Sequence, residues 1–415
     1  MKFDQYRITD SIKSNIAELG FKKPTDIQFK TIPHILKGED VLAIAQTGTG
    51  KTAAFAIPIL HQVKQLKISH RPSGVKCLVM APTHELADQI AKTFDLLGKD
   101  TGVSVLCVYG GVEQEPQIKQ LREGVDIVIA TPGRLFDLAY QQELILNEVE
   151  ILVLDEADHM LDLGFIKDIQ DLMHHVPQKR QTLFFSATID NKIKKVAYSL
   201  VSSNAIRIQI SPKDPVAKNI EHAVAYIDMD DKRFFLEGMI KNNEESKILV
   251  FVRTKVRAER VMKAMQRVEI VSETIHSDKT QEERDATMNH FRSGELKVLI
   301  ATDITARGID IPNVEFVVNY DLPETPENYV HRVGRTGRGN QKGQAVSFCS
   351  GEEKELLEEI ESSIGKRINR MDISKNEYEK TIEFSEEKTH DLNALMKEVE
   401  AFEISKKKKK KSKRK

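Results

Sequence analysis

The clearest chemical pattern in the sequence is the stretch AIAQTGTGKT at residues 43–52, where a glycine-rich turn leads into a lysine and a threonine. Gly48 and Gly50 permit a tight turn whose backbone N–H groups point at phosphate oxygens, and Lys51 can reach the β and γ phosphates of a nucleotide. The hydroxyl of Thr52 is then a candidate ligand for Mg²⁺ at the start of the next helix. Because the stretch stands between a strand-like run and a helix-like run, it predicts a phosphate-binding loop.

An acidic pair supplies the second half of that chemistry. The run ILVLDEAD at residues 151–158 ends an apolar, strand-like segment with Asp155 and Glu156. Asp155 is placed to hold Mg²⁺, directly or through water, and Glu156 to orient or deprotonate the water that attacks a phosphate. Acidic residues also favour helix N-termini for electrostatic reasons alone. Beside a phosphate-binding loop, the metal-assisted interpretation is the stronger of the two.

A cluster of arginines marks the second half of the chain. The run HRVGRTGR at residues 331–338 presents Arg332, Arg335 and Arg338 among glycines. Guanidinium groups match phosphate oxygens through paired hydrogen bonds. An exposed charge run is the alternative interpretation. A phosphate loop in one half and an arginine cluster in the other favour a nucleotide that is hydrolysed only when two domains close on it.

The elements that must position these residues follow from hydrophobic patterning. Short β-rich apolar runs alternate with longer runs of helical periodicity, which predicts an α/β fold with parallel sheets buried on both faces. The run SPKDPVAK at 211–218 indicates a linker between a first domain at 1–210 and a second at 219–370, followed by an acidic, helix-prone stretch and a lysine-rich tail at 371–415. Small hydroxyl residues stand near several strand ends, where ligands of parallel sheets bind: Thr83, Thr131, Ser186, Thr254 and Thr302.

Composition narrows the class of protein. The chain has 415 residues, of which 40% are hydrophobic and 30% charged, and this is typical of a soluble globular protein of two domains. No apolar stretch is long enough to span a bilayer and the N-terminus lacks a secretory h-region, so we expect a cytoplasmic protein. Cys77, Cys107 and Cys349 lie inside separate apolar runs without metal-ligand spacing, which predicts buried thiols.

Net charge is distributed unevenly along the chain. The whole chain carries −1, but residues 406–415 contain nine Lys and Arg, so the rest of the chain carries −10. Such a basic block has no apolar partners, and it predicts a disordered arm with affinity for polyanions. A solubilising tail is the alternative.

Several of these motifs together resemble the DEAD-box RNA helicases. The residues that carry the resemblance are DEAD at 155–158, AQTGTGKT at 45–52, SAT at 186–188 and HRVGRTGR at 331–338. Further signatures of the family follow in order within residues 3–350: GFKKPTDIQ at 20–28, GG at 110–111, TPGR at 131–134, QEER at 281–284 and TDITARGID at 302–310. The resemblance implies two tandem RecA-like parallel-sheet domains joined by a short linker, with a disordered basic C-terminal tail. Within the family the chain is similar to the bacterial RhlE-like branch.

The resemblance also implies roles for individual residues. Gln28 is expected to read the adenine edge, and the ATP site as a whole would contain Phe3, Phe21, Thr25, Gln28, Ala45, Gln46, Thr47, Gly48, Thr49, Gly50, Lys51, Thr52 and, near the ribose, Asp310. Catalysis would depend on Lys51, Asp155, Glu156, Arg335 and Arg338, with Mg²⁺ on Thr52 and Asp155 and with the arginines at the γ-phosphate. A path for single-stranded RNA would be lined by Thr83, Gly111, Thr131, Gly133, Arg134, Gln281, Arg284, Thr302 and Asp303. Asp158, Ser186, Thr188 and His331 would couple the two sites.

The implied activity is that of an RNA helicase that hydrolyses ATP with Mg²⁺ when RNA is bound and separates short duplexes with little sequence preference. The implied protein is a monomer whose partners are RNA and proteins of ribosome assembly or RNA decay. Two alternatives stay open: an ATP-gated RNA clamp or assembly scaffold, and a DNA helicase, which Gln28 and the DEAD quartet disfavour.

Two positions depart from the family pattern. His84 stands where the family commonly has Arg, and Ser277 stands where it commonly has Gly. A largely neutral imidazole attracts phosphate less than a guanidinium does, so we expect a weaker RNA contact at His84.

Overall fold

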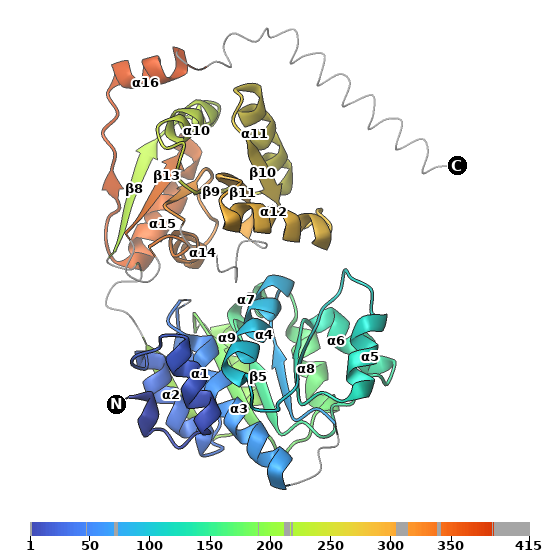
Figure 1. Ribbon diagram of the computed structural model, residues 1–415. Coiled ribbons are helices and arrows are strands. Elements are labelled where there is room, and N and C mark those ends of the chain that lie inside the picture. Colours follow the sequence, from blue (N-terminus) through green and yellow to red (C-terminus); the bar gives the residue numbers. More distant parts are fainter. Residues whose placement is uncertain are drawn as a thin grey trace. The chain divides into compact units, whose positions relative to one another are not determined.

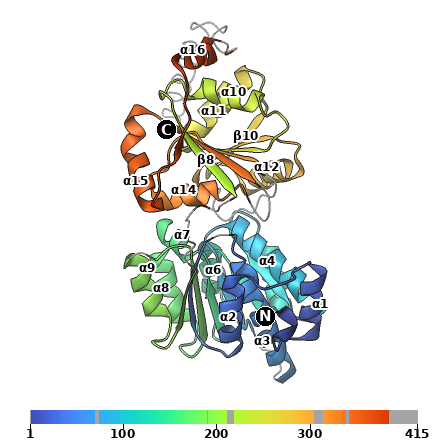
Figure 2. The same ribbon diagram turned by 90° about the vertical axis from the view of Figure 1, so that its left-hand side faces the viewer.

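The computed structural model describes residues 2–46, 48–69, 74–189, 191–210, 216, 219–303, 314–337, 342–383 and 385. These residues form two compact units, the first from the N-terminus to residue 216 and the second from residue 219 onward (Figures 1 and 2). The predicted linker, apart from Val216, and the predicted basic arm at 406–415 lie outside the described residues. None of the helices in the described ranges combines the length and the apolar character that crossing a bilayer requires.

The first unit is built on a sheet of seven strands in the order β3-β4-β2-β5-β6-β1-β7, and every strand pairs in parallel with its neighbours. The strands are β1 (Val41–Ala45), β2 (Cys77–Met80), β3 (Val105–Val108), β4 (Ile127–Ala130), β5 (Ile151–Leu154), β6 (Gln181–Ser186) and β7 (Ile206–Ile210). All residues of β1, β2, β4, β5 and β6 are buried. Such runs are typical of a parallel sheet covered on both faces, and the predicted sheet is confirmed.

Helices cover both faces of this sheet. One face packs against η1 (Phe3–Gln5), α1 (Asp10–Glu18), α2 (Asp26–Leu36), α3 (Lys51–Ser69) and α4 (His84–Gly98). The other face packs against α5 (Glu115–Glu123), α6 (Pro132–Tyr140), α7 (Ala157–Asp162), α8 (Ile166–His175) and α9 (Asn191–Leu200). Strand β2 shows how the pleat divides the two cores, because Cys77 and Val79 join the first while Leu78 and Met80 join the second.

The second unit repeats this architecture. Its sheet has seven strands in the order β10-β11-β9-β12-β13-β8-β14, again paired in parallel. The strands are β8 (Ile220–Tyr226), β9 (Ile248–Phe251), β10 (Ser272–Ile275), β11 (Val298–Ala301), β12 (Phe316–Asn319), β13 (Gly343–Cys349) and β14 (Asn369–Arg370). The helices are α10 (Lys232–Lys241), α11 (Lys255–Arg267), α12 (Gln281–Ser293), α14 (Pro326–Val333), η2 (Gly351–Glu353), α15 (Lys354–Ile364) and α16 (Lys375–Glu383). Two tandem parallel-sheet domains, the predicted fold class, are therefore confirmed.

Residues 369–383 are packed on this second unit. Strand β14 adds to the sheet edge beside β8, and α16 lies against α10 through Tyr378. The Tyr378 hydroxyl donates to the Asp231 carboxylate at 2.9 Å and accepts from the Asp228 N–H at 3.0 Å, while its ring lies 4.9 Å from that of Phe235. Part of the stretch that sequence analysis treated as an appendage is thus packed on the domain.

The three cysteine thiols are free, with Cys77 and Cys349 buried and Cys107 partly exposed. Burial raises the pKa of Cys107 to about 12 and that of Cys349 to about 11.

Candidate functional site

Predicted site residues of the first unit, whether for ATP, RNA or coupling, follow the carboxyl ends of its strands. The loop of Gly48 and Gly50 follows β1, Thr83 follows β2, Asp155 follows β5 and Ser186 ends β6. Because parallel strands all end at the same edge of a sheet, these residues share one edge, where ligands of such sheets bind. In the second unit Thr302 likewise follows β11.

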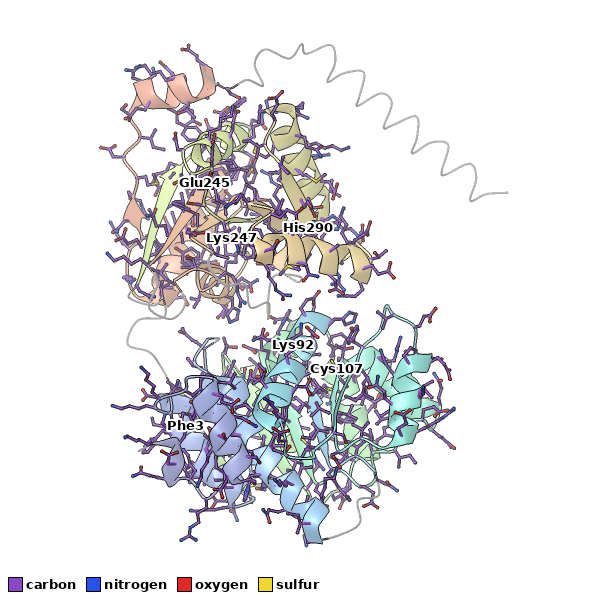
Figure 3. The ribbon with its side chains drawn as sticks, in the orientation of Figure 1. Phe3, Lys92, Cys107, Glu245, Lys247 and His290 are labelled. Atoms are coloured by element: carbon purple, nitrogen blue, oxygen red, sulfur yellow. The ribbon has the colours of Figure 1, made fainter. Side chains whose placement is uncertain are left out.

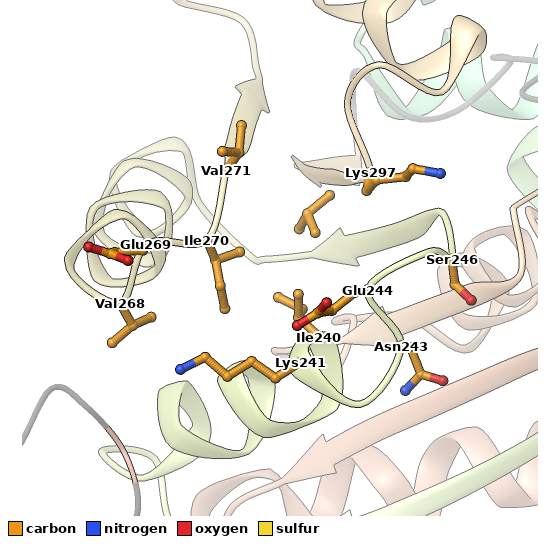
Figure 4. Close-up of a pocket in the computed structure, with 11 residues that line it drawn as sticks. Ile240, Lys241, Asn243, Glu244, Ser246, Val268, Glu269, Ile270, Val271 and Lys297 are labelled. Carbon is orange, nitrogen blue, oxygen red and sulfur yellow. The ribbon is translucent and has the colours of Figure 1, made fainter.

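A pocket in the second unit lies at the other edge of its sheet. It measures about 340 Å³ and is lined by the end of α10, the loop before β10 and the start of β11, with Ile240, Lys241, Val268, Ile270 and Lys297 among its residues (Figure 4). Strands β9, β10 and β11 begin at this edge, whereas Thr302 and Asp303 follow the carboxyl end of β11. The pocket is therefore separate from the residues predicted to bind RNA in this unit.

The loop after β1 has the backbone that its glycines permit. Gly48 and Gly50 have φ angles of 79° and 90°, in the left-handed region that side chains disfavour. Lys51 begins α3 and is only 6% exposed, and its Nζ has no hydrogen-bond acceptor among the described residues. A buried ammonium at a helix N-terminus, beside backbone N–H groups, fits the oxygens of a phosphate. Thr47, also predicted for this loop, lies outside the described residues.

Gln28 is bonded to the same loop. Its Oε1 accepts from the Thr25 N–H at 3.0 Å, which closes a capping box at the start of α2, and its Nε2 donates to the Gly50 carbonyl at 3.1 Å. A Cβ added at Gly50 would lie 2.6 Å from that nitrogen. Adenine reading by Gln28 stays a prediction. Its attachment to the phosphate loop is a role that sequence reasoning missed, because nothing in the sequence places residues 28 and 50 together.

The two aromatic residues predicted near the base differ in exposure. Phe3 is 4% exposed and lies among the N-terminal elements (Figure 3). Its ring centroid is 6.2 Å from that of Tyr6 and 6.4 Å from that of Phe21. Phe21 is 40% exposed. Phe21 is therefore accessible from solvent, whereas Phe3 is covered by its neighbours.

Asp155 and Glu156 form a buried acidic pair. Asp155 is 2% exposed and accepts from the Glu156 N–H at 3.0 Å. Burial raises the pKa of Asp155 to about 6, the charge of Lys51 opposes that rise, and the charge of Glu156 adds to it. Glu156 has a φ of 48° and a ψ of 49°, an unusual left-handed conformation for a residue with a side chain.

The last carboxylate of the DEAD quartet holds the SAT segment. One oxygen of Asp158 accepts from the Ala187 N–H at 3.2 Å, from the Thr188 N–H at 3.1 Å and from the Thr188 hydroxyl at 3.2 Å. The Ser186 hydroxyl donates to the Thr188 carbonyl at 2.8 Å. Asp158, Ser186 and Thr188, which were predicted to couple two sites, are thus brought together inside the first unit.

The residues predicted to line an RNA path occupy loop ends and helix starts. Thr83 caps α4 by accepting from the Leu86 N–H at 3.3 Å, and Thr131 precedes α6. His84 packs its ring 4.9 Å from that of Tyr109. Arg134 is 8% exposed, and its guanidinium is hydrogen-bonded within the protein.

In the second unit, the predicted RNA residues Asp303, Arg284 and Gln281 are hydrogen-bonded to other side chains, and only Asp303 has its partner in another motif. Arg332, only 2% exposed, donates to the two oxygens of Asp303 at 2.5 and 2.7 Å. Arg284 donates to Gln281, whose Nε2 in turn donates to Asp285 at 2.9 Å. Sequence reasoning gave Arg332 no separate role.

The predicted arginine fingers fall partly within the described residues. Arg335 is 3% exposed, and its Nε donates to the His331 carbonyl at 3.1 Å. Asp310 and Arg338, predicted for the ribose and the γ-phosphate, lie outside the described residues.

Mg²⁺ suits the donors at this edge. The described part of the chain has no group of three or more His, Cys, Asp or Glu that could hold a metal ion by itself. Mg²⁺ usually takes one or two carboxylates together with substrate phosphates and water, and it does not require an all-protein cage. Asp155, Thr52 and a nucleotide bound by the loop would supply such a set.

The sequence and the fold are both similar to known helicases. The DEAD/DEAH box helicase family matches residues 25–196, and the helicase conserved C-terminal domain matches residues 231–340. The ATP-dependent RNA helicase CshA of Listeria monocytogenes is 40% identical over 370 residues, which cover 89% of this chain and 70% of that protein. The DEAD-box ATP-dependent RNA helicase CshA of Bacillus subtilis is 37% identical over 371 residues, which cover 89% of this chain and 74% of that protein. The structure of S. cerevisiae Dbp5 bound to RNA and ADP BeF3 matches this fold with a TM-score of 0.80 at 29% identity. The matched region covers 92% of this chain and 99% of the Dbp5 chain.

Proposed function

Because this chain belongs to the DEAD-box family and is an ATP-dependent RNA helicase, we propose that its first unit binds ATP and Mg²⁺ at the carboxyl edge of the sheet. The observation that carries the proposal is the pair of buried opposite charges at that edge. Lys51 Nζ is buried without an acceptor among the described residues, and Asp155 is a carboxyl group whose pKa burial has raised to about 6. Phosphate oxygens would satisfy the first group and Mg²⁺ the second.

In the proposed reaction a water molecule attacks the γ-phosphorus of ATP, the bond from that phosphorus to the β,γ-bridging oxygen breaks, and ADP and phosphate are the products. Asp155 and the Thr52 hydroxyl would hold Mg²⁺, which supplies positive charge to the phosphate oxygens. Glu156 follows Asp155 with a left-handed backbone, and its charge acts on Asp155. We assign to its carboxylate the orientation of the attacking water. Arg335 and Arg338 of the second unit would stabilise the charge that develops on the phosphate.

The proposed RNA path runs along loops that carry glycines. A Cβ added at Gly110 or at Gly133 would meet no described atom within 4 Å, and neither residue has a positive φ. The fold itself therefore does not require glycine at either position. Close approach of an RNA backbone would require glycine at both positions, because a side chain there would block the RNA. Thr83, Gly111, Thr131 and Asp303 belong to the same proposed path.

The finer assignments complete the proposal. We place the enzyme in the cytoplasm as a monomer that acts on single-stranded RNA and short duplexes. Proteins of ribosome assembly or RNA decay would recruit it. The similarity to CshA helicases leaves the RhlE-like assignment as a prediction.

Two substitutions test the assignment of the catalytic residues. Lys51→Ala should abolish nucleotide binding or turnover, because it removes the only buried cation that the described loop offers to phosphate. Glu156→Gln should keep ATP and RNA bound but stop hydrolysis. The measurements are RNA-stimulated phosphate release and RNA binding in the presence of ATP.

A matched control is available at the opposite end of β5. Glu150 is exposed just before β5 begins, so Glu150→Gln makes the same chemical change at the other end of the strand and should leave turnover unaltered. Substantial hydrolysis by Glu156→Gln would contradict the proposed role of Glu156. Slow turnover of the wild type with long-lived RNA binding in ATP would instead favour the RNA clamp.

A further inference from the structure

Gln117, on α5, is bonded to two segments that carry predicted RNA contacts. Its side chain is 8% exposed. Its Nε2 donates to the Tyr109 carbonyl at 3.2 Å, and its Oε1 accepts from Arg134 Nη1 at 2.9 Å. Both ends of one buried amide are therefore used, one toward the loop after β3 and the other toward the start of α6.

The loop between β3 and α5 is held on both sides of its glycines. The Tyr109 carbonyl, on one side, is bonded to Gln117, and the Val112 carbonyl, on the other, accepts from Arg134 Nη2 at 2.7 Å. Gly110 and Gly111 lie between these anchors and have no side chains that could fix them by packing. Gly111 has a φ of 80°, and glycine loses more conformational freedom on ordering than other residues do. The hydrogen bonds to the Tyr109 and Val112 carbonyls therefore fix the backbone conformation of Gly110 and Gly111.

The position of the Arg134 guanidinium depends on the same part of the protein. It is 8% exposed, and the acceptors the structure gives it are Gln117 Oε1 and the Val112 carbonyl. A buried charged donor that loses an acceptor carries a desolvation cost until it moves to another one. Loss of Gln117 would therefore release the Tyr109 carbonyl directly and displace the Val112 carbonyl through Arg134.

We propose that Gln117 is a positioning residue for RNA binding, which holds Arg134 and the Tyr109 carbonyl so that the loop of Gly110 and Gly111 has the shape that receives the RNA backbone. The inference rests on the proposed RNA path and adds a residue that acts through the loop. A glutamine that only satisfies buried polar groups is the alternative. The two differ in what they affect, because positioning alters RNA binding and leaves ATP binding intact, whereas general stability alters both.

The test is Gln117→Leu, which keeps the approximate size of the side chain and removes both hydrogen bonds. The RNA concentration that half-saturates ATP hydrolysis should rise about tenfold or more, since a hydrogen bond to a buried charge is of that order. Turnover at saturating RNA and ATP affinity without RNA should stay near wild type. Gln120→Leu is the matched control, because Gln120 is exposed on the same helix and should leave the half-saturating RNA concentration unchanged.

A second variant separates positioning from folding. Gln117→Glu keeps an acceptor for Arg134 but sets a carboxylate oxygen, which cannot donate, against the Tyr109 carbonyl. The RNA concentration that half-saturates hydrolysis should therefore rise in this variant too, while ATP affinity without RNA stays near wild type. If Gln117→Glu has the RNA requirement of wild type, or if either variant loses ATP affinity in parallel with RNA affinity, the positioning role is wrong.

The outcomes for the wild type and the variant also distinguish this inference from the proposed function. A wild type whose hydrolysis does not respond to RNA would overturn the proposed function, and the inference with it. A responsive wild type with an unchanged RNA requirement in Gln117→Leu would overturn the positioning role alone.

Discussion

The buried carboxyl group of Asp155 leads to a prediction about stability. Asp155 is 2% exposed, and burial raises its pKa from 3.8 to about 6 against the opposing charge of Lys51. A carboxyl group whose pKa is higher in the folded protein than in the unfolded chain reduces stability when it is ionised. Asn has the shape of the protonated carboxyl group. Asp155→Asn should therefore stabilise the first unit at neutral pH when no nucleotide is present.

The size of this effect and its pH dependence follow from the two pKa values. One pKa unit corresponds to about 1.4 kcal/mol, so a rise from 3.8 to about 6 corresponds to about 3 kcal/mol above pH 6. Between the two pKa values the folded wild type binds more protons than the unfolded chain does, so its stability increases as the pH falls. The advantage of the variant is thus full above about pH 6 and disappears toward pH 3.8.

Hydrogen exchange in β1 and β5, measured without nucleotide or metal, would follow the first unit by itself. At about pH 7.5 the variant should exchange about 100-fold more slowly than wild type, and at about pH 5 only about tenfold more slowly. Asp171→Asn, an exposed aspartate on α8, is the control and should change neither value. Mg²⁺ with ATP should then protect wild type far more than the variant. The reasoning is refuted if Asp155→Asn gives no protection at pH 7.5 or the same protection at both pH values.

Three further predictions concern the nucleotide, the base and the tail. Arg335→Ala should lower turnover by about 10³-fold with a much smaller change in ATP affinity, as a transition-state contact should, and an equal loss in both would mean ground-state binding instead. Gln28→Ala should reduce the preference for ATP over GTP by about tenfold, since a bidentate amide contact contributes about 1–3 kcal/mol of discrimination, and unchanged selectivity would reject Gln28 as the reader. Ending the chain at Ser405 removes nine positive charges and should flatten the salt dependence of RNA binding by a slope of up to about 6 in log–log form, with little change in saturated turnover. An unaltered slope would show that the arm does not bind RNA.

The sequence predicted the sheets well because burial of a parallel strand leaves a continuous apolar signature. ILVL at 151–154 and VLIA at 298–301 are buried strands at every position, and the polar residues after them start the predicted site. The phosphate-binding loop could be predicted equally well, since its glycines and Lys51 are neighbours in the chain. Hydrophobic periodicity did not predict that Phe3 is buried and Phe21 exposed, because it does not say which of two nearby aromatic rings the helices cover.

Hydrogen-bond partners that are distant in the chain could not be predicted. Gln117 stands in an amphipathic helix, where a glutamine on the buried face gives no signal of the arginine and the carbonyl that it meets. The attachment of Tyr378 to α10 is similar, because the stretch around it is acidic and has little apolar pattern. In both cases the polar contact depends on tertiary placement, which a hydrophobic pattern does not encode.

Contacts within the second unit connect a residue proposed to bind RNA with the proposed arginine finger. Arg332 donates to both oxygens of Asp303 and, through Nη1, to the Asp321 carbonyl at 2.7 Å. Because Arg332 is buried and lies on α14, a displacement of Asp303 by RNA must either break a charged pair or move that helix. The same helix carries His331, whose carbonyl accepts from Arg335. A shift at the proposed RNA path would therefore reach the proposed arginine finger through one buried guanidinium, because breaking a buried charged pair is strongly destabilising.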